Sequence, residues 1–150
     1  MNIVIPISGE GRRFVEAGFP EKPFIDINGK TLIETVLSSL PVPWLEQAKF
    51  TFVTREDYAP RIKVIANKMS LNNSVVTVKE TTKGAACTVL LAKQILDPAE
   101  QKESLVIING DQVVKFSLLN FNTLANTLRL SGYAKDVTGI VTVFKAEGTK

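Results

Sequence analysis

The sequence contains no histidine and only one cysteine among its 150 residues. Without histidine the chain cannot form a Ser-His-Asp or Cys-His catalytic centre, and most zinc sites are excluded as well. The single Cys87 cannot form an internal disulfide, which is usual for proteins of a reducing compartment. Because Cys87 lies in the apolar run GAACTVLLA, we expect it to be a small buried hydrophobic residue rather than a nucleophile.

Long apolar runs are also missing. None approaches the roughly 20 residues of a membrane-spanning helix, and the N-terminal segment MNIVIPISG lacks the basic region of a signal peptide. The net charge is +3, with the Lys and Arg residues scattered along the chain. This charge suits an anionic small molecule at least as well as a nucleic acid. We therefore expect a cytoplasmic protein that binds neither membranes nor nucleic acid.

The sequence is an alternation of strand-like and helix-like segments. Hydrophobic periodicity predicts helices at 31–40, 58–69, 84–96 and 118–130, and strands at 3–5, 24–27, 49–54, 74–79, 104–109 and 138–144. The unbroken apolar run at 105–108 is typical of a central parallel strand buried on both faces. The order predicts one α/β domain over residues 1–150, a Rossmann-like open and mainly parallel sheet with helices on both faces. Trp44, between two prolines and the next strand, is expected to be a surface anchor.

Three polar loops follow predicted strands, at 8–13 (SGEGRR), 81–84 (TTKG) and 109–112 (NGDQ). Ligands of open parallel sheets bind beyond the carboxyl ends of the strands, so we expect these loops to open on one edge. Two common phosphate-binding motifs do not fit. In the dinucleotide-binding motif G-x-G-x-x-G, Phe14 stands where the third glycine belongs, and we expect an irregular stretch there instead of a helix. In the Walker A motif, Phe24 stands where the first glycine would lie.

The first loop has the features of a phosphate cradle. Gly9 and Gly11 would let backbone N–H groups approach a polyphosphate closely. Arg12 and Arg13 can supply forked donors to phosphate oxygens, and Lys22 adds a mobile positive charge. A flexible surface loop with ordinary charges is an equally open interpretation.

The other two loops hold a candidate metal ligand and a candidate base contact. Asp111 follows a strand, and Mg²⁺ on a nucleotide is commonly held by one or two carboxylates together with phosphate oxygens. An Asp that merely begins a turn is the alternative. Gly84 begins a helix whose small residues Ala85 and Ala86 would let a flat base approach, although tight helix–sheet packing explains these residues equally well.

Together these segments resemble the sugar-phosphate nucleotidylyltransferase family. That family has a strand followed by G-x-G-[ST]-R-[FL] and a later P-K-P, to which IVIPISGEGRRF and FPEKPFIDINGKTLIETVL are similar. TTKGAACTVLLAK is similar to the stretch that contacts the base, and LVIINGDQVV to the strand that ends in a magnesium-binding Asp. The resemblance covers residues 1 to about 144. It implies the nucleotide-diphospho-sugar transferase fold and transfer of a nucleoside monophosphate from a nucleoside triphosphate to a sugar phosphate, with release of pyrophosphate.

The resemblance also implies roles for individual residues. Catalysis would depend on Arg13, Lys22 and Asp111, through positioning and neutralisation of charge. Ile7, Ser8 and Gly9 would contact the nucleoside through backbone atoms, and Gly84 would contact the base. Gly11, Arg12 and Arg13 would bind the triphosphate, and Lys22 would bind phosphate. Asp111 would bind Mg²⁺.

Three departures from the family pattern bear on function. Arg12 occupies the usual Ser/Thr position, and Glu21 replaces a proline and puts a negative charge beside Lys22. Family members usually continue for about another hundred residues, a domain-sized portion, which supplies the acceptor pocket and a second metal carboxylate. We therefore expect an apparently truncated nucleotide-binding portion whose acceptor-binding portion is absent.

Two alternatives to a complete transferase remain open. The chain can be a nucleotide-binding domain without turnover, which joins a complementary C-terminal half or another copy of itself. A glycosyltransferase that uses a nucleotide sugar is a lower-ranked alternative, because Asp111-Gln112-Val113 is not the D-x-D motif typical of those enzymes.

Overall fold

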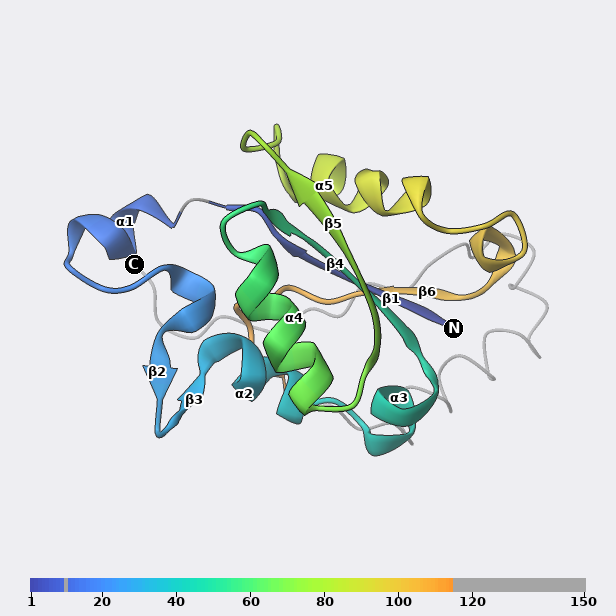
Figure 1. The fold of residues 1–150 in the computed structure, drawn as a ribbon, viewed down its shortest axis with the longest axis horizontal. Helices are drawn as coiled ribbons and strands as arrows, with labels where there is room; N and C mark the ends of the chain where they lie inside the picture. The colour runs from blue at the N-terminus through green and yellow to red at the C-terminus, as the bar shows by residue number, and fades with distance from the viewer. Residues whose placement is uncertain (10, 115–150) are drawn as a thin grey trace, which may run out of the picture. The chain divides into compact units, whose positions relative to one another are not determined.

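The main sheet has four parallel strands in the order β5-β4-β1-β6 (Figure 1). The computed structural model of the chain describes residues 1–9 and 11–114, which belong to one compact unit. The helix predicted at 118–130 and the strand predicted at 138–144 lie outside the described residues. The strands are β1 (Asn2–Ile7), β4 (Lys49–Arg55), β5 (Asn72–Val78) and β6 (Leu105–Ile107).

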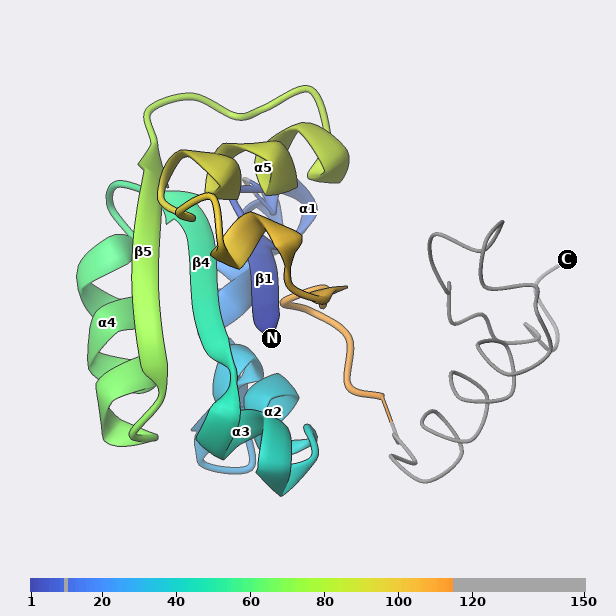
Figure 2. The ribbon, with the colours of Figure 1, turned by 90° about the vertical axis from the view of Figure 1, so that its right-hand side faces the viewer.

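Helices connect these strands and cover both faces of the sheet. The α-helices are α1 (Arg12–Glu16), α2 (Leu32–Ser38), α3 (Val42–Gln47), α4 (Ala59–Lys68) and α5 (Ala85–Leu91); the 3₁₀ helices are η1 (Lys22–Phe24), η2 (Ala92–Gln94) and η3 (Glu100–Lys102). Connections between parallel strands are right-handed. The chain steps outward from β1 to β4 and β5 and then returns to β6, so α5 lies on the face opposite α2 and α4 (Figure 2). The predicted fold class is confirmed.

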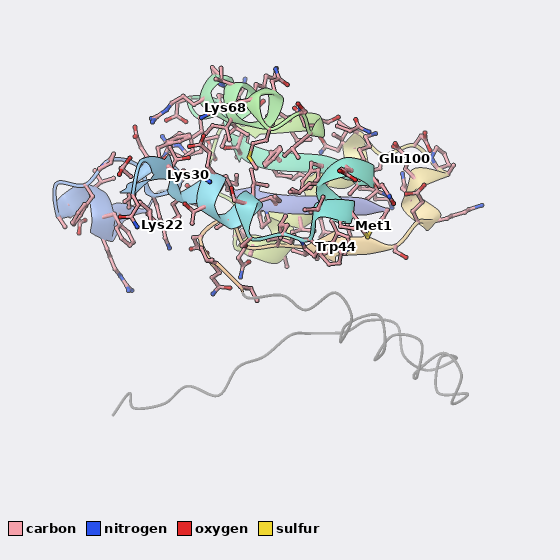
Figure 3. All side chains as sticks on the ribbon, turned by 90° about the horizontal axis from the view of Figure 1, so that it is seen from below. Met1, Lys22, Lys30, Trp44, Lys68 and Glu100 are labelled. Atoms are coloured by element: carbon pink, nitrogen blue, oxygen red, sulfur yellow. The ribbon has the colours of Figure 1, made fainter. Side chains whose placement is uncertain are left out.

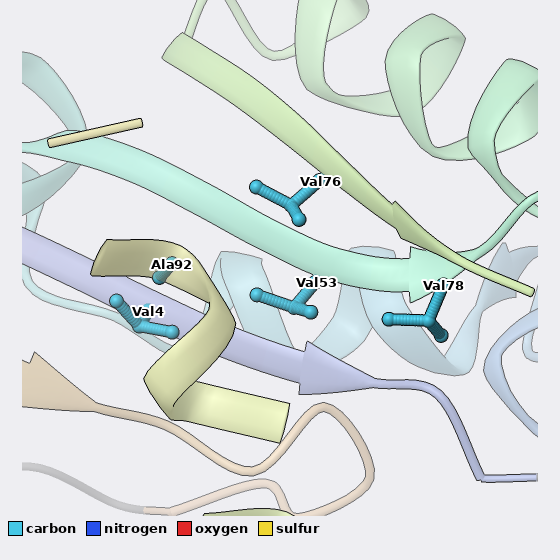
Figure 4. Close-up of a cluster of buried hydrophobic side chains, with 5 residues drawn as sticks. All are labelled: Val4, Val53, Val76, Val78 and Ala92. Carbon is cyan, nitrogen blue, oxygen red and sulfur yellow. The ribbon is translucent and has the colours of Figure 1, made fainter. Parts of the chain in front are cut away.

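The core follows from the two-residue period of the central strands. Val4 of β1 faces α5 and packs in a buried cluster with three valines of β4 and β5 and with Ala92 of η2 (Figure 4). The neighbouring Ile5 points to the other face, where Phe50 and Phe52 of β4 stack with ring centroids 6.3 Å apart. Each buried valine, isoleucine or phenylalanine of this core stabilises the fold by about 1.5–3 kcal/mol relative to exposure.

A hairpin and a capping box introduce α2. The strands β2 (Asp26–Ile27) and β3 (Lys30–Thr31) pair antiparallel around the predicted Asn28-Gly29 turn, whose φ angles are 54° and 81°. Both residues are left-handed, as a two-residue hairpin turn requires. Thr31 then caps α2: its Oγ1 accepts from the Glu34 backbone N–H at 3.3 Å, and its own N–H donates to Glu34 Oε2 at 2.9 Å.

The strand predicted to be central behaves differently. Among the described strands β6 is one of the two edge strands of the sheet, with β1 as its neighbour, and Leu105 and Ile107 are 51% and 54% exposed. The prediction that both faces are buried is therefore not met within the part of the chain that the structure describes. An unbroken apolar run indicates that both faces are apolar, but it does not give the strand's place in the sheet.

Several local predictions are wrong for identifiable reasons. Cys87 is exposed, because α5 turns the next residue, Thr88, toward the sheet and successive side chains differ by about 100° around a helix. The helix predicted at 84–96 changes to 3₁₀ geometry at Ala92. Trp44 is buried at 8% exposure, because it lies on the inward face of the short helix α3, which has Pro41 at its N-cap and Pro43 in its first turn.

Candidate functional site

A cleft of about 390 Å³ opens at the carboxyl edge of the sheet. Small-molecule sites have volumes of about 300–1,000 Å³, so the cleft is large enough for a ligand of that size. Figure 3 shows Lys22, which lines the cleft, at the end of the sheet opposite Met1 and Glu100. The lining residues come from four separate segments of the chain: Pro6, Ile7, Gly9, Gly11, Lys22, Pro23, Ala85, Asn109, Gly110, Asp111 and Gln112.

The loop after β1 is shaped by Gly11. Its φ of 61° is left-handed, and a Cβ at this position would lie 3.2 Å from Lys22 Cβ. Glycine is therefore required both by the backbone and by the close approach of the two segments. The short helix α1 begins directly after Gly11, so the expectation of an irregular stretch there is wrong. The Lys22 ammonium lies 5.2 Å from the centroid of the Phe14 ring of α1.

Lys22 and Asp111 form an ion pair in the cleft. Lys22 Nζ donates to Asp111 Oδ2, and the two side chains are 32% and 39% exposed. An ion pair this accessible to water contributes about 0–1 kcal/mol to stability. The pair is therefore weak enough to separate when a stronger ligand arrives. A cation able to bind phosphate and a carboxylate able to bind a metal thus lie side by side.

Glu21 does not face the cleft. Its Oε2 lies 3.5 Å from Arg61 Nη1 on α4, and the Arg61 guanidinium lies 3.6 Å from the centroid of the Phe24 ring. The negative charge that the sequence places next to Lys22 is thus partly balanced from α4. Lys22 itself is directed to Asp111 instead.

The loop after β6 is fixed by close packing against β1. Gly110 is buried, and an added Cβ would lie 3.2 Å from Ile7 Cγ1 and 3.4 Å from Ile5 Cγ2. The Ile108 N–H donates to the Val4 carbonyl at 3.0 Å. Sequence reasoning did not assign a role to Gly110, although its position between a strand and the candidate Asp111 was the available signal.

A buried hydroxyl cluster joins the loop after β1 to α5. Ser8 Oγ lies 2.9 Å from Thr88 Oγ1, and the two residues are 5% and 2% exposed. Thr88 Oγ1 also contacts the hydroxyl of Thr82 and lies 3.2 Å from the Gly84 carbonyl oxygen. Thr82 and Thr88 were not among the predicted site residues, because no spacing in the sequence connects them to Ser8.

The structure brings most of the predicted residues to the cleft. Ile7, Gly9, Gly11, Lys22 and Asp111 line it. Ser8 lies beneath the surface in the hydroxyl cluster. The other three predicted residues are not among the lining residues: Arg12 and Arg13 are exposed at the start of α1, and Gly84 precedes the lining residue Ala85.

The donor set limits what kind of metal site this edge can form. No group of three or more His, Cys, Asp or Glu residues suited to a metal ion occurs within residues 1–9 and 11–114. Asp111 is the single carboxylate among the described residues that line the cleft. One carboxylate fits Mg²⁺ when the remaining ligands are phosphate oxygens and water, and it does not fit a metal site made of protein ligands alone.

Comparison with solved structures agrees with this geometry. A nucleoside-diphosphate-sugar pyrophosphorylase from Vibrio cholerae superposes with a TM-score of 0.69 and 25% identity, over 81% of this chain and 52% of that chain. A 4-diphosphocytidyl-2C-methyl-D-erythritol synthase from Anaerococcus prevotii gives 0.57 and 25%, over 85% and 50%. An inositol-1-phosphate CTP transferase from T. maritima gives 0.62 and 23%, over 73% and 43%. The sequence itself matches no family model and no curated protein.

The sheet and its carboxyl-edge cleft define a Rossmann-like α/β domain of the nucleotide-diphospho-sugar transferase fold. The resemblance to the NTP-transferase family is confirmed by the two neighbours with 25% identity. The chain spans about half the length of the structures it matches. Among its described helices, none is long and apolar enough to cross a membrane.

Proposed function

We propose that the chain is the nucleotide-binding portion of a nucleotidylyltransferase, which transfers a nucleoside monophosphate from a nucleoside triphosphate to a sugar phosphate. The observation that carries the proposal is the meeting of Gly11, Lys22 and Asp111 in one cleft. These residues combine a close backbone approach, a positive charge and a carboxylate, which a triphosphate with its metal ion requires. The similarity to nucleotidyltransferases in fold supports the same reaction class.

The proposed contacts divide the cleft into a phosphate side and a nucleoside side. On the phosphate side, backbone atoms of Gly11 approach the triphosphate and Lys22 supplies the neighbouring positive charge, whereas the backbone of Gly9 contacts the nucleoside. Arg12 and Arg13 at the start of α1 add guanidinium groups at the rim. Backbone atoms of Ile7 and Ser8 and the segment at Gly84 contact the nucleoside and its base.

Asp111 is the proposed protein ligand of Mg²⁺. Bound Mg²⁺ would neutralise phosphate charge and hold the phosphate chain in one conformation. Because Lys22 is the present partner of Asp111, its ammonium group is already positioned to move to a phosphate oxygen when the carboxylate takes the metal. The acceptor-binding residues and a second metal carboxylate would come from outside the described part of the chain.

The proposed reaction is a substitution at phosphorus. An oxygen of the sugar phosphate attacks the α-phosphorus, the bond between that phosphorus and its bridging oxygen breaks, and pyrophosphate leaves with the bonding electrons. The attacking phosphate is already ionised, so no general base is needed. Lys22 and the arginines act by positioning the substrates and by stabilising the charge that develops on the leaving group.

The test has a binding stage and a turnover stage. Calorimetry with ATP, CTP, GTP and UTP, each with Mg²⁺, should show one preferred triphosphate. Release of pyrophosphate is then measured with that triphosphate and a panel of sugar 1-phosphates. Failure of all four triphosphates to bind would overturn the proposal.

A second candidate is a nucleotide-binding domain without turnover. It is favoured by one observation, that the chain spans about half the length of its structural neighbours. In that case a triphosphate binds but no sugar 1-phosphate gives pyrophosphate until a complementary half is supplied. Robust release of pyrophosphate by the chain alone would exclude this candidate.

A further inference from the structure

The hydroxyl cluster of Ser8, Thr82 and Thr88 connects three segments at the cleft. Ser8 follows β1, Thr82 belongs to the loop between β5 and α5, and Thr88 lies on the buried side of α5. Thr88 is the common member, because its Oγ1 contacts both other hydroxyls and the carbonyl of Gly84. The Thr82 hydroxyl also lies 3.2 Å from that carbonyl.

The cluster determines which atoms of each segment face the cleft. The Ser8 hydroxyl is directed to Thr88 and is buried, so Ser8 can offer only its backbone to a ligand. Gly84, with φ of 133°, holds a conformation that other residues rarely adopt. Its carbonyl is held by Thr88, whose backbone N–H also donates to it at 3.1 Å. One buried side chain thus fixes the segments on either side of the proposed base position.

We propose that Thr88 is a positioning residue for the nucleoside side of the cleft. The proposal rests on the proposed function, and it assigns to Thr88 the alignment of Ser8 with the segment 82–84. Thr88 does not line the cleft, so its effect is exerted through the residues it holds. The phosphate side, formed by Gly11 and Lys22, has no contact with Thr88 in the cluster.

Because Thr88 holds only the nucleoside side, its loss should weaken binding of a nucleoside triphosphate but not binding of a polyphosphate alone. Thr88→Val keeps the shape of the side chain but removes the hydroxyl, which leaves the buried Ser8 Oγ without this partner; an unpaired buried hydroxyl is costly. We expect Thr88→Val to weaken binding of the preferred nucleoside triphosphate about tenfold. Binding of inorganic tripolyphosphate, which has no nucleoside, should change less than about twofold.

Two further variants complete the experiment. Thr88→Ser retains the hydroxyl and should bind the nucleoside triphosphate as the wild-type chain does. Thr77→Val removes an exposed hydroxyl from β5 and serves as the matched control, with no effect on either ligand. If Thr88→Val does not fold, Thr82→Val removes the loop partner of the cluster from a half-buried position and should show the same selective loss.

The results separate this inference from the function on which it rests. Equal weakening of triphosphate and tripolyphosphate binding, or no weakening of either, would overturn the role of Thr88 and leave the nucleotide site intact. A wild-type chain that binds tripolyphosphate but none of the four nucleoside triphosphates would instead overturn the proposed function itself, and the role of Thr88 with it.

Discussion

Lys22 and Asp111 are direct partners in the cleft although 89 residues separate them along the chain. Lys22 begins η1, whereas Asp111 follows β6, so the contact depends on the pairing of β6 with β1. In the proposed site the two groups exchange this contact for a phosphate oxygen and a metal ion. The ion pair therefore keeps two ligand-binding groups close to each other before a ligand arrives.

Asp111→Asn tests the proposed metal ligand. The change keeps the shape of the side chain and removes the charge that Mg²⁺ requires, so the gain in triphosphate affinity that Mg²⁺ gives should disappear. Calorimetry with and without Mg²⁺ measures this gain. Glu46→Gln removes an equal charge from the exposed side of α3 and should leave the gain unchanged. A gain of undiminished size in Asp111→Asn would contradict the assignment.

Gly11→Ala tests the approach of the first loop to Lys22. A left-handed alanine costs about 1–2 kcal/mol, and the new Cβ would press on Lys22 Cβ. We expect reduced stability in urea unfolding and weaker binding of tripolyphosphate. Gly29→Ala is the matched control, because φ is 81° at Gly29 but no atom lies within 4 Å of the added Cβ. It should lose similar stability and keep its affinity; an equal loss of affinity would contradict the proposed contact.

Gly110→Ala tests whether close packing positions Asp111. The added methyl group would lie 3.2 Å from Ile7 Cγ1, closer than most such contacts, and 3.4 Å from Ile5 Cγ2; overpacking of a buried site costs about 1–3 kcal/mol. Urea unfolding should show this loss. Gly9→Ala adds the same group where nothing lies within 4 Å, so its stability should stay near that of the wild-type chain. A stable Gly110→Ala protein with unchanged ligand binding would show that the loop can move without consequence.

Glu34→Gln tests the capping box of α2 through its pH dependence. Hydrogen bonds from the Thr31 backbone and from Lys68 lower the pKa of Glu34 from 4.5 to about 2. A carboxyl group with a lowered pKa stabilises the fold above its unfolded pKa and loses this contribution as the pH falls toward 2. The free energy of unfolding of the wild-type chain should therefore exceed that of Glu34→Gln by about 0.3–1 kcal/mol at pH 7, the usual contribution of a negative charge near a helix N-terminus, and the difference should shrink between pH 4.5 and 2. Urea unfolding at several pH values measures it; a difference independent of pH would contradict the assignment.

Much of the fold is predictable because local patterns and burial agree. The strand predicted at 49–54 is Lys49–Arg55, and the helix predicted at 58–69 is Ala59–Lys68. The alternation of apolar residues in strands and their helical spacing in helices predict an element correctly where it has one clear apolar face. These patterns do not predict that Cys87 is exposed, because α5 is short and the buried residue on its inward face is the polar Thr88.

The candidate site is predictable in part, for a different reason. The rule that ligands bind at the carboxyl edge of a parallel sheet places Gly11 and Asp111 near each other, and both line the cleft. The rule does not predict which side chains contact each other. The contact of Lys22 with Asp111 and that of Ser8 with Thr88 depend on the tertiary packing of distant segments, about which sequence spacing contains no information.

The pairing of β1 with β6 also sets the time at which the cleft can form. One wall belongs to β1, which comes first in the chain among the strands of the described sheet, and the other follows β6, which comes last. Such contacts between distant segments form slowly, because a long loop must close first. A nascent chain that has emerged from the ribosome only as far as η3 would contain β1, β4 and β5 but not Asp111. It would have a partial sheet and no place for a ligand.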